Sequence, residues 1–387
     1  MPDGSEHISV RVAERIAAIG EAEWDACAGG ADPFLSHAFL GALEEAECVS
    51  AESGWLPRHL AVEGPDGGVV AVAPLYVKGH SQGEYVFDWG WADAYERAGG
   101  RYYPKLQCAV PFTPAPGRRL LARPGPGAVA AEAALAAGME ELAERHGLSS
   151  VHVTFLPEDQ AARLGERGWL VRHGIQYHWC NRGYRDFDDF LSALMSRKRK
   201  SIARERRRVA EAGIRTPILC GDDIKSRHWD AFHRFYVDTY DRKWGYPYLN
   251  REFFELLTER LGDRVVLVMA EQDGQLIAGA LNLHGSKALY GRNWGAAGEY
   301  RFLHFEACYY RAIDFAIEHG LERVEAGTQG PHKVQRGYEP VRTFSAHLIR
   351  DPGLREPVAD FIRRESRQVA HEMDAMAEMT PYRRGGN

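Results

Sequence analysis

The sequence predicts an α/β fold with a mixed sheet, built as a tandem duplication of one unit. The stretch Ser286–Leu348 reads as a strand, a helix and a strand, the order that builds a parallel strand pair. Two similar segments, His146–Val151 and His319–Val324, each end a helix with His-Gly-Leu and begin a strand. Each has a hairpin upstream and a strand downstream, so the order of elements also repeats. We therefore expect two domains, residues 1–183 and 184–387.

Composition and charge are those of an ordinary globular protein. The 387 residues are 45% apolar and 26% charged, enough for two buried cores. A net charge of −6 excludes a generic nucleic-acid binder for the molecule as a whole. The six cysteines are scattered without a C-x-x-C pair, which predicts reduced thiols. Without a leader pattern or an apolar run of about 20 residues, we expect a cytoplasmic protein with no transmembrane segment.

The first half contains turn and helix signals in a regular order. Asp32 and Pro33 open an amphipathic helix, and Gly64–Gly68 is a hairpin turn between two strands. A dense aromatic segment follows and is interpreted as strand-rich. The expected elements are a helix to residue 47, strands 58–63 and 69–78, the aromatic segment 84–107, a helix 128–146, a strand 149–155, a helix 158–167 and a strand 170–181.

The second half begins with a charged helix and ends with a polar one. A hairpin turns at Asp273-Gly274, and Gly320 ends a helix of about five turns, as glycine often does. The expected elements are helices 186–213, 225–244 and 250–261, strands 263–272, 275–284 and 288–294, a helix 302–319, strands 323–326 and 343–349, and a tail helix from 356, with 381–387 disordered.

The order of elements resembles the GNAT acyltransferase fold, and two copies in tandem resemble the Fem-type aminoacyltransferases of peptidoglycan bridges. Several strings resemble a bacterial family of N-acyltransferases related to peptidoglycan biosynthesis. The resemblance covers nearly the whole chain and implies N-acyl transfer without fixing the substrate. It also implies that the first domain serves the acceptor and the second the donor. The strings are Pro33–His37, Ala73–Tyr76, Ser81–Trp89, Tyr102–Leu106, Val110–Pro114, His304–Glu306 and Gln329–Lys333.

The loop between residues 295 and 303 is the predicted donor site. Backbone N–H groups at a helix start attract anions, and arginines add ion pairs. A charged Glu299 departs from the usual acetyl-CoA turn of the family, so acyl-CoA and another activated carrier both stay open. The alternative is a plain strand–helix turn with surface arginines. The predicted donor-binding residues are Arg292, Gly295, Gly298 and Arg301.

Four residues are predicted to carry the chemistry. His304 and Glu306 lie in the first helical turn, where either could take the proton of an attacking amine. Lys333 or Arg336, on a loop rich in glycine, could stabilise a tetrahedral oxyanion. The alternatives are a capping carboxylate, a packed histidine and a solvated basic loop.

The aromatic segment is predicted to bind the acceptor. Aromatic rings with carboxylates among them suit a sugar, a peptide or an amine, although core packing is the usual explanation for such rings. Carboxylates are costly to bury without partners. The predicted acceptor-binding residues are Asp88, Trp89, Trp91, Asp93, Tyr102 and Lys105.

A strongly basic run lies between Arg197 and Arg208. It could hold RNA phosphates, a nucleotide diphosphate or a membrane surface, whereas a solvated helical face is the default interpretation. A contact with tRNA is therefore one predicted partner, and base stacking is not indicated because no aromatic residue interrupts the run.

Three functions remain open on the sequence. The first is an N-acyltransferase, with acyl-CoA as the favoured co-substrate and direct attack by an amine of a small molecule or cell-wall precursor. The second is a Fem-type transferase that uses aminoacyl-tRNA on a peptidoglycan precursor. The third is a binding protein that kept the fold without chemistry. No covalent nucleophile, metal cluster or permanently bound cofactor is predicted, and the sequence does not give the oligomeric state.

Overall fold

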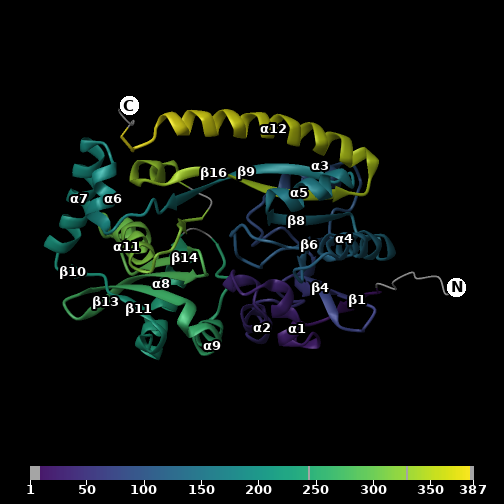
Figure 1. Ribbon diagram of the computed structural model, residues 1–387, viewed down its shortest axis with the longest axis horizontal. Helices are drawn as coiled ribbons and strands as arrows, with labels where there is room; N and C mark the ends of the chain where they lie inside the picture. The colour runs from purple at the N-terminus through teal and green to yellow at the C-terminus, as the bar shows by residue number, and fades with distance from the viewer. Residues whose placement is uncertain (1–8, 243–244, 328–329, 384–387) are drawn as a thin grey trace. The chain divides into compact units, whose positions relative to one another are not determined.

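The computed structural model describes residues 9–242, 245–327 and 330–383. Gln329, from one of the strings above, and the end of the predicted tail after residue 383 lie outside the described residues. The chain forms two compact units: the first unit comprises residues 1–174 and 342–369, and the second comprises residues 175–341 and 370–387. The unit boundaries fall inside three elements, β9 (Leu170–Cys180), β16 (Glu339–Ile349) and α12 (Pro352–Glu378), which are labelled in Figure 1.

The first unit contains two groups of strands. One is an antiparallel sheet in the order β1-β3-β4-β7, and the other has the order β16-β8-β6-β5-β2. Strands β6 and β8 are parallel, and helix α4 lies between them in the sequence. The strands are β1 (Ser9–Ala13), β2 (Trp55–Pro57), β3 (His59–Glu63), β4 (Val69–Ala73), β5 (Leu75–Lys78), β6 (Lys105–Cys108), β7 (Leu121–Ala122) and β8 (Ser150–Leu156).

The helices of the first unit pack an apolar core against these strands. Leu135 and Met139 of α4 are fully buried in it, and burying a side chain of this size contributes about 2 kcal/mol. The α-helices are α1 (Glu21–Ala28), α2 (His37–Glu45), α3 (Trp89–Arg97), α4 (Ala128–Arg145) and α5 (Glu158–Glu166), with short 3-10 turns η1 (Ile16–Ala18) and η2 (Pro33–Leu35).

Two expectations for the first unit were wrong. The predicted strand 69–78 is two strands in different sheets, because Pro74 has no N–H to donate and interrupts the ladder between β4 and β5. The aromatic segment is not strand-rich: its central part is helix α3, with Trp91 on the buried side and Trp89 exposed.

The second unit repeats the central order of elements of the first: a pair of helices, an antiparallel pair of strands, and a parallel pair of strands with a helical segment between them in the sequence. Its strands follow the order β10-β12-β13-β14-β15-β9, β11 also pairs with β12, and the parallel pair is β14 and β15. Its strands are β10 (Ile214–Arg215), β11 (Ile218–Cys220), β12 (Val265–Gln272), β13 (Gln275–His284), β14 (Ala288–Ala296) and β15 (Arg323–Glu325). Its helices are α6 (Phe187–Ala193), α7 (Ser196–Glu211), α8 (Ser226–Arg242), α9 (Arg251–Leu261), α10 (Leu303–Phe305) and α11 (Arg311–Glu318), with short turns η3 (Gly221–Asp223), η4 (Gly262–Arg264), η5 (Glu306–Tyr310) and η6 (Pro331–Arg336).

Two predicted long helices are interrupted. The helix expected over 186–213 breaks at Leu194, which is buried in an extended conformation between α6 and α7. The helix expected over 302–319 contains a π-helical turn, η5, between α10 and α11. Phe302, directly before α10, has a left-handed backbone (φ 67°), which is uncommon for a bulky residue. Interruptions of this π type often mark functional sites.

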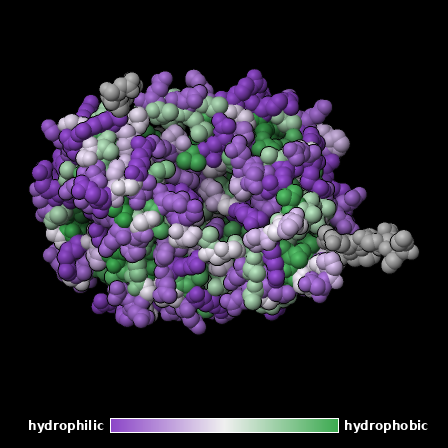
Figure 2. Space-filling view, viewed as in Figure 1, coloured by the Kyte–Doolittle hydropathy of each residue, from purple (hydrophilic) through white to green (hydrophobic). Residues whose placement is uncertain are grey.

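The face shown in Figure 2 is mostly hydrophilic, with separate apolar patches. Among the described helices, none has both the length and the apolar character that crossing a bilayer requires. The six cysteines are all free thiols.

Candidate active site in the second unit

A β-bulge in β14 opens the sheet of the second unit. Leu281 pairs with Asn293, whereas the next residue, Asn282, pairs with Gly291, so Arg292 is the extra residue. A bulge bends its strand and is frequent beside active sites. Strand β14 pairs with β15 over Ala288–Tyr290 and then continues past the end of β15. The opening therefore lies at the carboxyl ends of two parallel strands, where α/β sheets bind ligands.

A cavity of about 100 Å³ occupies this opening. Asn293 contributes an acceptor: its Oδ1 atom is buried and has no hydrogen-bond partner among the described residues. Such an oxygen is suited to accept an N–H from a bound ligand. The polar and aromatic residues of the lining are Asn282, Arg292, Asn293, Trp294, His304, Cys308 and Tyr309.

The π-helical turn places Tyr309 beside this cavity. Its hydroxyl lies 3.0 Å from Nε2 of His332, on η6. Burial raises the pKa of Tyr309 well above its usual range, so the hydroxyl stays protonated. His332 is exposed, but partial desolvation lowers its pKa, and Arg336 and Lys333 lower it further, so the imidazole is neutral near pH 7. In the tautomer with Nε2 unprotonated, the phenol donates to the imidazole, and the pair can pass a proton.

A wider cavity of about 610 Å³ surrounds the loop that enters α10. It shares Trp294 and His304 with the smaller cavity. Its charged lining consists of two cationic residues, Arg242 and Arg301, and one acidic residue, Glu299. Arg242 donates to the carbonyl of Ala296 at 2.6 Å, which ties α8 to the end of β14. The wider cavity can hold the carrier of a group whose reactive end reaches the smaller one.

Three of the four predicted donor residues line these two cavities. Arg292 lines the smaller one, and Gly298 and Arg301 line the wider one. Gly295 has another reason to be glycine: a Cβ there would lie 2.4 Å from the backbone carbon of Phe235 in α8. Gly295 therefore lets β14 and α8 approach closely.

The predicted base candidates lie in different surroundings. His304 lines both cavities and packs edge-on against Trp294. Glu306 is buried, and its Oε1 accepts from Arg206 at 3.0 Å. Burial raises the pKa of Glu306 although Arg206 opposes the shift. Glu306 is not among the lining residues of the two cavities, and its role as a base stays a prediction.

Lys333 and Arg336, the predicted oxyanion residues, both have protein partners. Lys333 is buried, and its Nζ donates to the carbonyls of Ala326 at 2.5 Å and Gly327 at 3.1 Å. Burial lowers the pKa of Lys333 to about 8. Arg336 donates to Tyr310 at 3.0 Å and lines a separate cavity beside α7. Their roles at an oxyanion also stay predictions.

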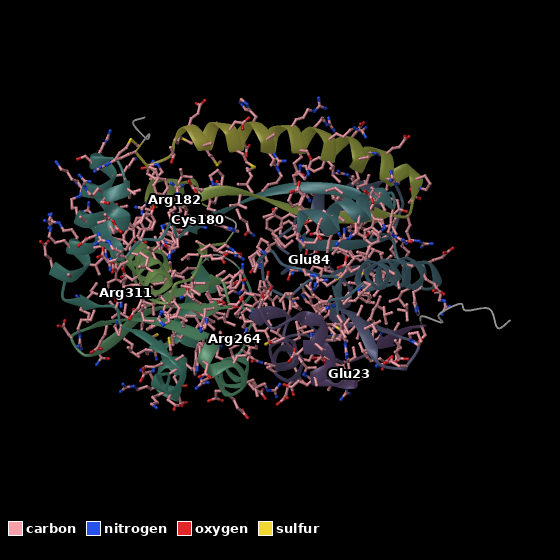
Figure 3. All side chains as sticks on the ribbon, viewed as in Figure 1. Glu23, Glu84, Cys180, Arg182, Arg264 and Arg311 are labelled. Atoms are coloured by element: carbon pink, nitrogen blue, oxygen red, sulfur yellow. The ribbon has the colours of Figure 1, made fainter. Side chains whose placement is uncertain are left out.

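The predicted acceptor residues separate into a buried group and an exposed one. Lys105 is fully buried, and its Nζ lies 2.5 Å from Asp88 and 2.7 Å from Glu84, whose position Figure 3 marks. The Tyr102 hydroxyl donates to Asp88 at 2.7 Å. Burial would lower the pKa of Lys105, but Glu84 and Asp88 raise it, so the lysine is charged.

The remaining acceptor candidates lie outside this network. Trp91 packs edge-on against His347, with ring centres 5.1 Å apart. Trp89 is exposed, and Asp93 forms an exposed ion pair with Arg97 at 2.9 Å. The structure therefore joins Asp88, Tyr102 and Lys105 in one buried network and leaves Trp89 and Asp93 at the surface. Acceptor binding by these residues stays a prediction.

Sequence reasoning missed Asn293 and Tyr309 and left His332 without a role. Asn293 follows the bulge, and no local pattern marks a bulge in a continuous strand. Tyr309 lies in an apolar helical stretch, where an aromatic residue indicates core packing. For His332, the glycine-rich loop that contains it was the available signal in the sequence.

Comparisons with known proteins define the family and the fold. The profile of the FemAB-like family, described as peptidoglycan biosynthesis/recognition, matches residues 15–384. The crystal structure of FemX is 15% identical, with a TM-score of 0.56, and the match covers 88% of this chain and 98% of that chain. The structure of L-PGS from Bacillus licheniformis is 10% identical, with a TM-score of 0.52, covering 86% and 98%.

A tandem GNAT protein from the clavulanic acid biosynthesis pathway matches with a TM-score of 0.48 and 13% identity, covering 89% of this chain and 99% of that chain. No curated protein matches the chain. The family match confirms the resemblance drawn from the sequence strings. The likeness to FemX and the repeated order of elements confirm the predicted α/β fold of tandem GNAT-like units.

Proposed function

Because the chain belongs to the FemAB-like family of peptidoglycan biosynthesis and recognition, we propose that it transfers an acyl or aminoacyl group from an activated donor to an amine acceptor. The observation that carries this proposal is the cavity at the bulge of β14, just beyond the end of β15. The bulge at Arg292 opens the sheet there, and an unpartnered acceptor oxygen, Asn293 Oδ1, lies beside a phenol–imidazole pair.

The side chains of this cavity fit direct attack by an amine. Asn293 Oδ1 accepts one N–H of the amine and orients its lone pair toward the acyl carbon. The new C–N bond forms as the bond from the acyl carbon to its carrier breaks. The hydroxyl oxygen of Tyr309, which lines the cavity, takes the proton lost by the amine as its own proton passes to Nε2 of His332. The reverse transfer, from His332 through Tyr309, then protonates the departing carrier atom. The net result is transfer of one proton from the amine to the carrier.

Cavity size limits the transferred group. A volume of about 100 Å³ has room for a few heavy atoms, so we expect a short acyl or small aminoacyl group. The carrier would occupy the wider cavity, where Arg242 and Arg301 suit an anionic group. Acyl-CoA is the first donor candidate. Aminoacyl-tRNA is the second donor candidate.

The test supplies short acyl-CoAs and aminoacyl-tRNAs together with an amine-bearing peptidoglycan precursor, and detects the product by mass spectrometry. We expect product with one donor class. Asn293→Ala and Tyr309→Phe should lower kcat by about 100-fold or more while the fold is kept. Arg207→Ala, an exposed residue of α7, is the control and should retain the wild-type rate. Absence of product with every donor, or wild-type rates in both cavity variants, would refute the proposal.

A further inference from the structure

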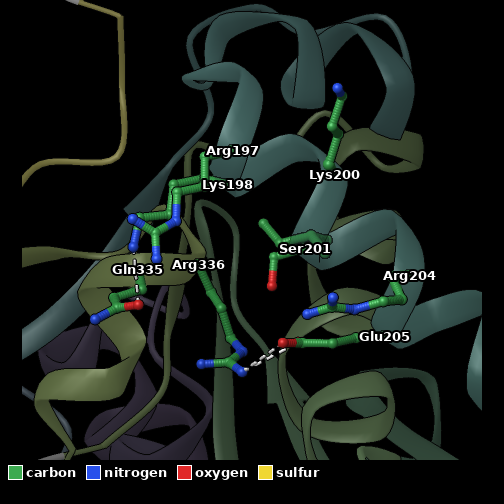
Figure 4. Close-up of a pocket in the computed structure, with 9 residues that line it drawn as sticks. Arg197, Lys198, Lys200, Ser201, Arg204, Glu205, Gln335 and Arg336 are labelled. Carbon is green, nitrogen blue, oxygen red and sulfur yellow. Dashed lines mark hydrogen bonds and ion pairs between the residues drawn. The ribbon is translucent and has the colours of Figure 1, made fainter.

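A second polar cavity in the second unit lies between α7 and η6 (Figure 4). Its volume is about 420 Å³, within the range of small-ligand sites. It is separate in its lining residues from the two cavities of the proposed active site. Its charged lining is almost entirely cationic: Arg197, Lys198, Lys200, Arg204 and Arg336.

The acidic residue of the lining, Glu205, does not neutralise this set. Its two carboxylate oxygens accept from Arg336 at 3.1 and 3.0 Å, and it also accepts from the hydroxyl of Tyr310. Arg336 is fixed further by its position over the ring of Phe305, 3.5 Å from the ring centre. Glu205 therefore compensates one cation and holds it in place, and the other four cations remain.

These four cations have little compensation from the protein. Lys198 donates to the amide oxygen of Gln335 at 2.9 Å, which leaves its charge unpaired. Among the described residues, Arg197, Lys200 and Arg204 form no ion pair. They lie three and four positions apart and so share one face of the helix. Like charges around one cavity repel each other, and a bound anion removes that cost.

The other half of the same helix is neutralised. Arg206 contacts Glu306 at 3.0 Å and Asp314 at 2.7 Å. Arg207 and Arg208 reach Glu211 at 3.7 and 3.4 Å. The last three arginines of the helix thus have acidic partners, whereas among the described residues the helix cations that surround the cavity, and Arg199 beside them, form no ion pair with an acid.

We propose that this cavity binds the diphosphate group of a small ligand. Guanidinium groups match phosphate oxygens in a bidentate fork, and a diphosphate balances several positive charges in a compact volume. A concave site favours a compact anion over an extended RNA backbone, and none of its lining residues is aromatic, so it has no ring for base stacking. The proposal does not depend on the function proposed above.

Isothermal titration calorimetry with inorganic pyrophosphate and with a nucleoside diphosphate tests the proposal on the full chain. Two double variants remove the same charge from the same helix: R197A/R204A inside the cavity and R207A/R208A outside it. We expect saturable binding to the wild type, a loss of affinity of about tenfold or more in R197A/R204A, and a change of about twofold or less in R207A/R208A. Lys200→Glu is a second cavity variant, for use if the first does not fold by circular dichroism.

A short single-stranded RNA, titrated at several salt concentrations, forms the other arm. RNA that binds more tightly than the diphosphates and weakens equally in both double variants would replace the proposal with a nucleic-acid surface. Equal losses of pyrophosphate affinity in the two double variants would indicate a diffuse field and overturn it. So would a wild type that does not bind pyrophosphate or the nucleoside diphosphate.

Discussion

At the scale of residues, burial decides what the basic side chains near the candidate site can do. Lys333 is the clearest case, because its ammonium lies in the interior and donates to two backbone carbonyls. In the sequence Lys333 belongs to a loop with three glycines. That pattern does not distinguish a buried lysine from a solvated one or from one that stabilises an oxyanion. Burial lowers its pKa from 10.5 to about 8, and this shift can be measured.

Lys333→Met should change how stability depends on pH. Between about pH 8 and 10.5 the unfolded wild type binds more protons at this lysine than the folded protein does. The free energy of unfolding of the wild type should therefore rise with pH across this window, by about 3 kcal/mol relative to the variant. Urea denaturation of both proteins at several pH values measures the difference. Parallel stability curves would show that the lysine is not buried as described.

Some site residues were predictable from the sequence because helix starts carry local signals. The order of strand, loop and helix predicted a donor site that includes Arg292, Gly298 and Arg301. All three line the candidate cavities, and their role in donor binding stays a prediction. Gly295 was also predicted as a donor residue, but it does not line these cavities, and its close approach to α8 depends on a helix about sixty residues earlier in the chain. Asn293 depends on the bulge, a property of the strand pairing that the sequence pattern of one strand does not contain.

At the scale of elements, α7 has two differently charged halves. The sequence showed one basic run, because charge composition does not reveal which acids lie nearby in space. Arg206 contacts two acids of the segment η5–α11, one of them buried, and lies over the ring of Phe187, 4.2 Å from its centre. The same limit applies to the π-helical turn, whose residues have an ordinary helical pattern.

Arg206→Met should destabilise the second unit by about 2–3 kcal/mol, because it leaves the buried Glu306 without its cation, whereas Asp314 keeps Arg311 at 2.9 Å. Arg207→Met, one residue further on, removes an exposed pair and should change stability by about 0.5 kcal/mol or less. Chemical denaturation measures both variants. Similar losses in the two would mean that Arg206 is no more important to the fold than a surface arginine.

At the scale of the whole molecule, the sequence showed the repeat. It did not show that the sheet of each unit includes a strand segment from the other repeat. The first unit contains residues 342–369, and the second begins inside β9. In the first unit, Phe344–Ile349 of β16 pairs with β8. In the second, β15 pairs with the end of β9. Local patterns give the strands and their order but not which sheet each one joins, so the boundary at residue 183 remains a prediction about the repeats.

A fragment of residues 1–183 should not fold on its own. It lacks β16 and the part of α12 that supplies Leu354, Val358 and Ile362 to a core cluster of the first unit. We expect the fragment to show no cooperative thermal transition by circular dichroism. Adding residues 184–387 as a separate chain should restore the transition. A fragment 1–183 that melts cooperatively alone would show that the first unit does not need the later segment.

The exchanged strands also bear on how such a chain arose. An ancestor with one repeat and this topology would have no partner in its own chain for its last strand, and two copies would have to trade those strands to close their sheets. Gene fusion would then have joined an intertwined homodimer into one polypeptide. Each half could afterwards diverge in sequence, but neither could be lost without leaving the other incomplete.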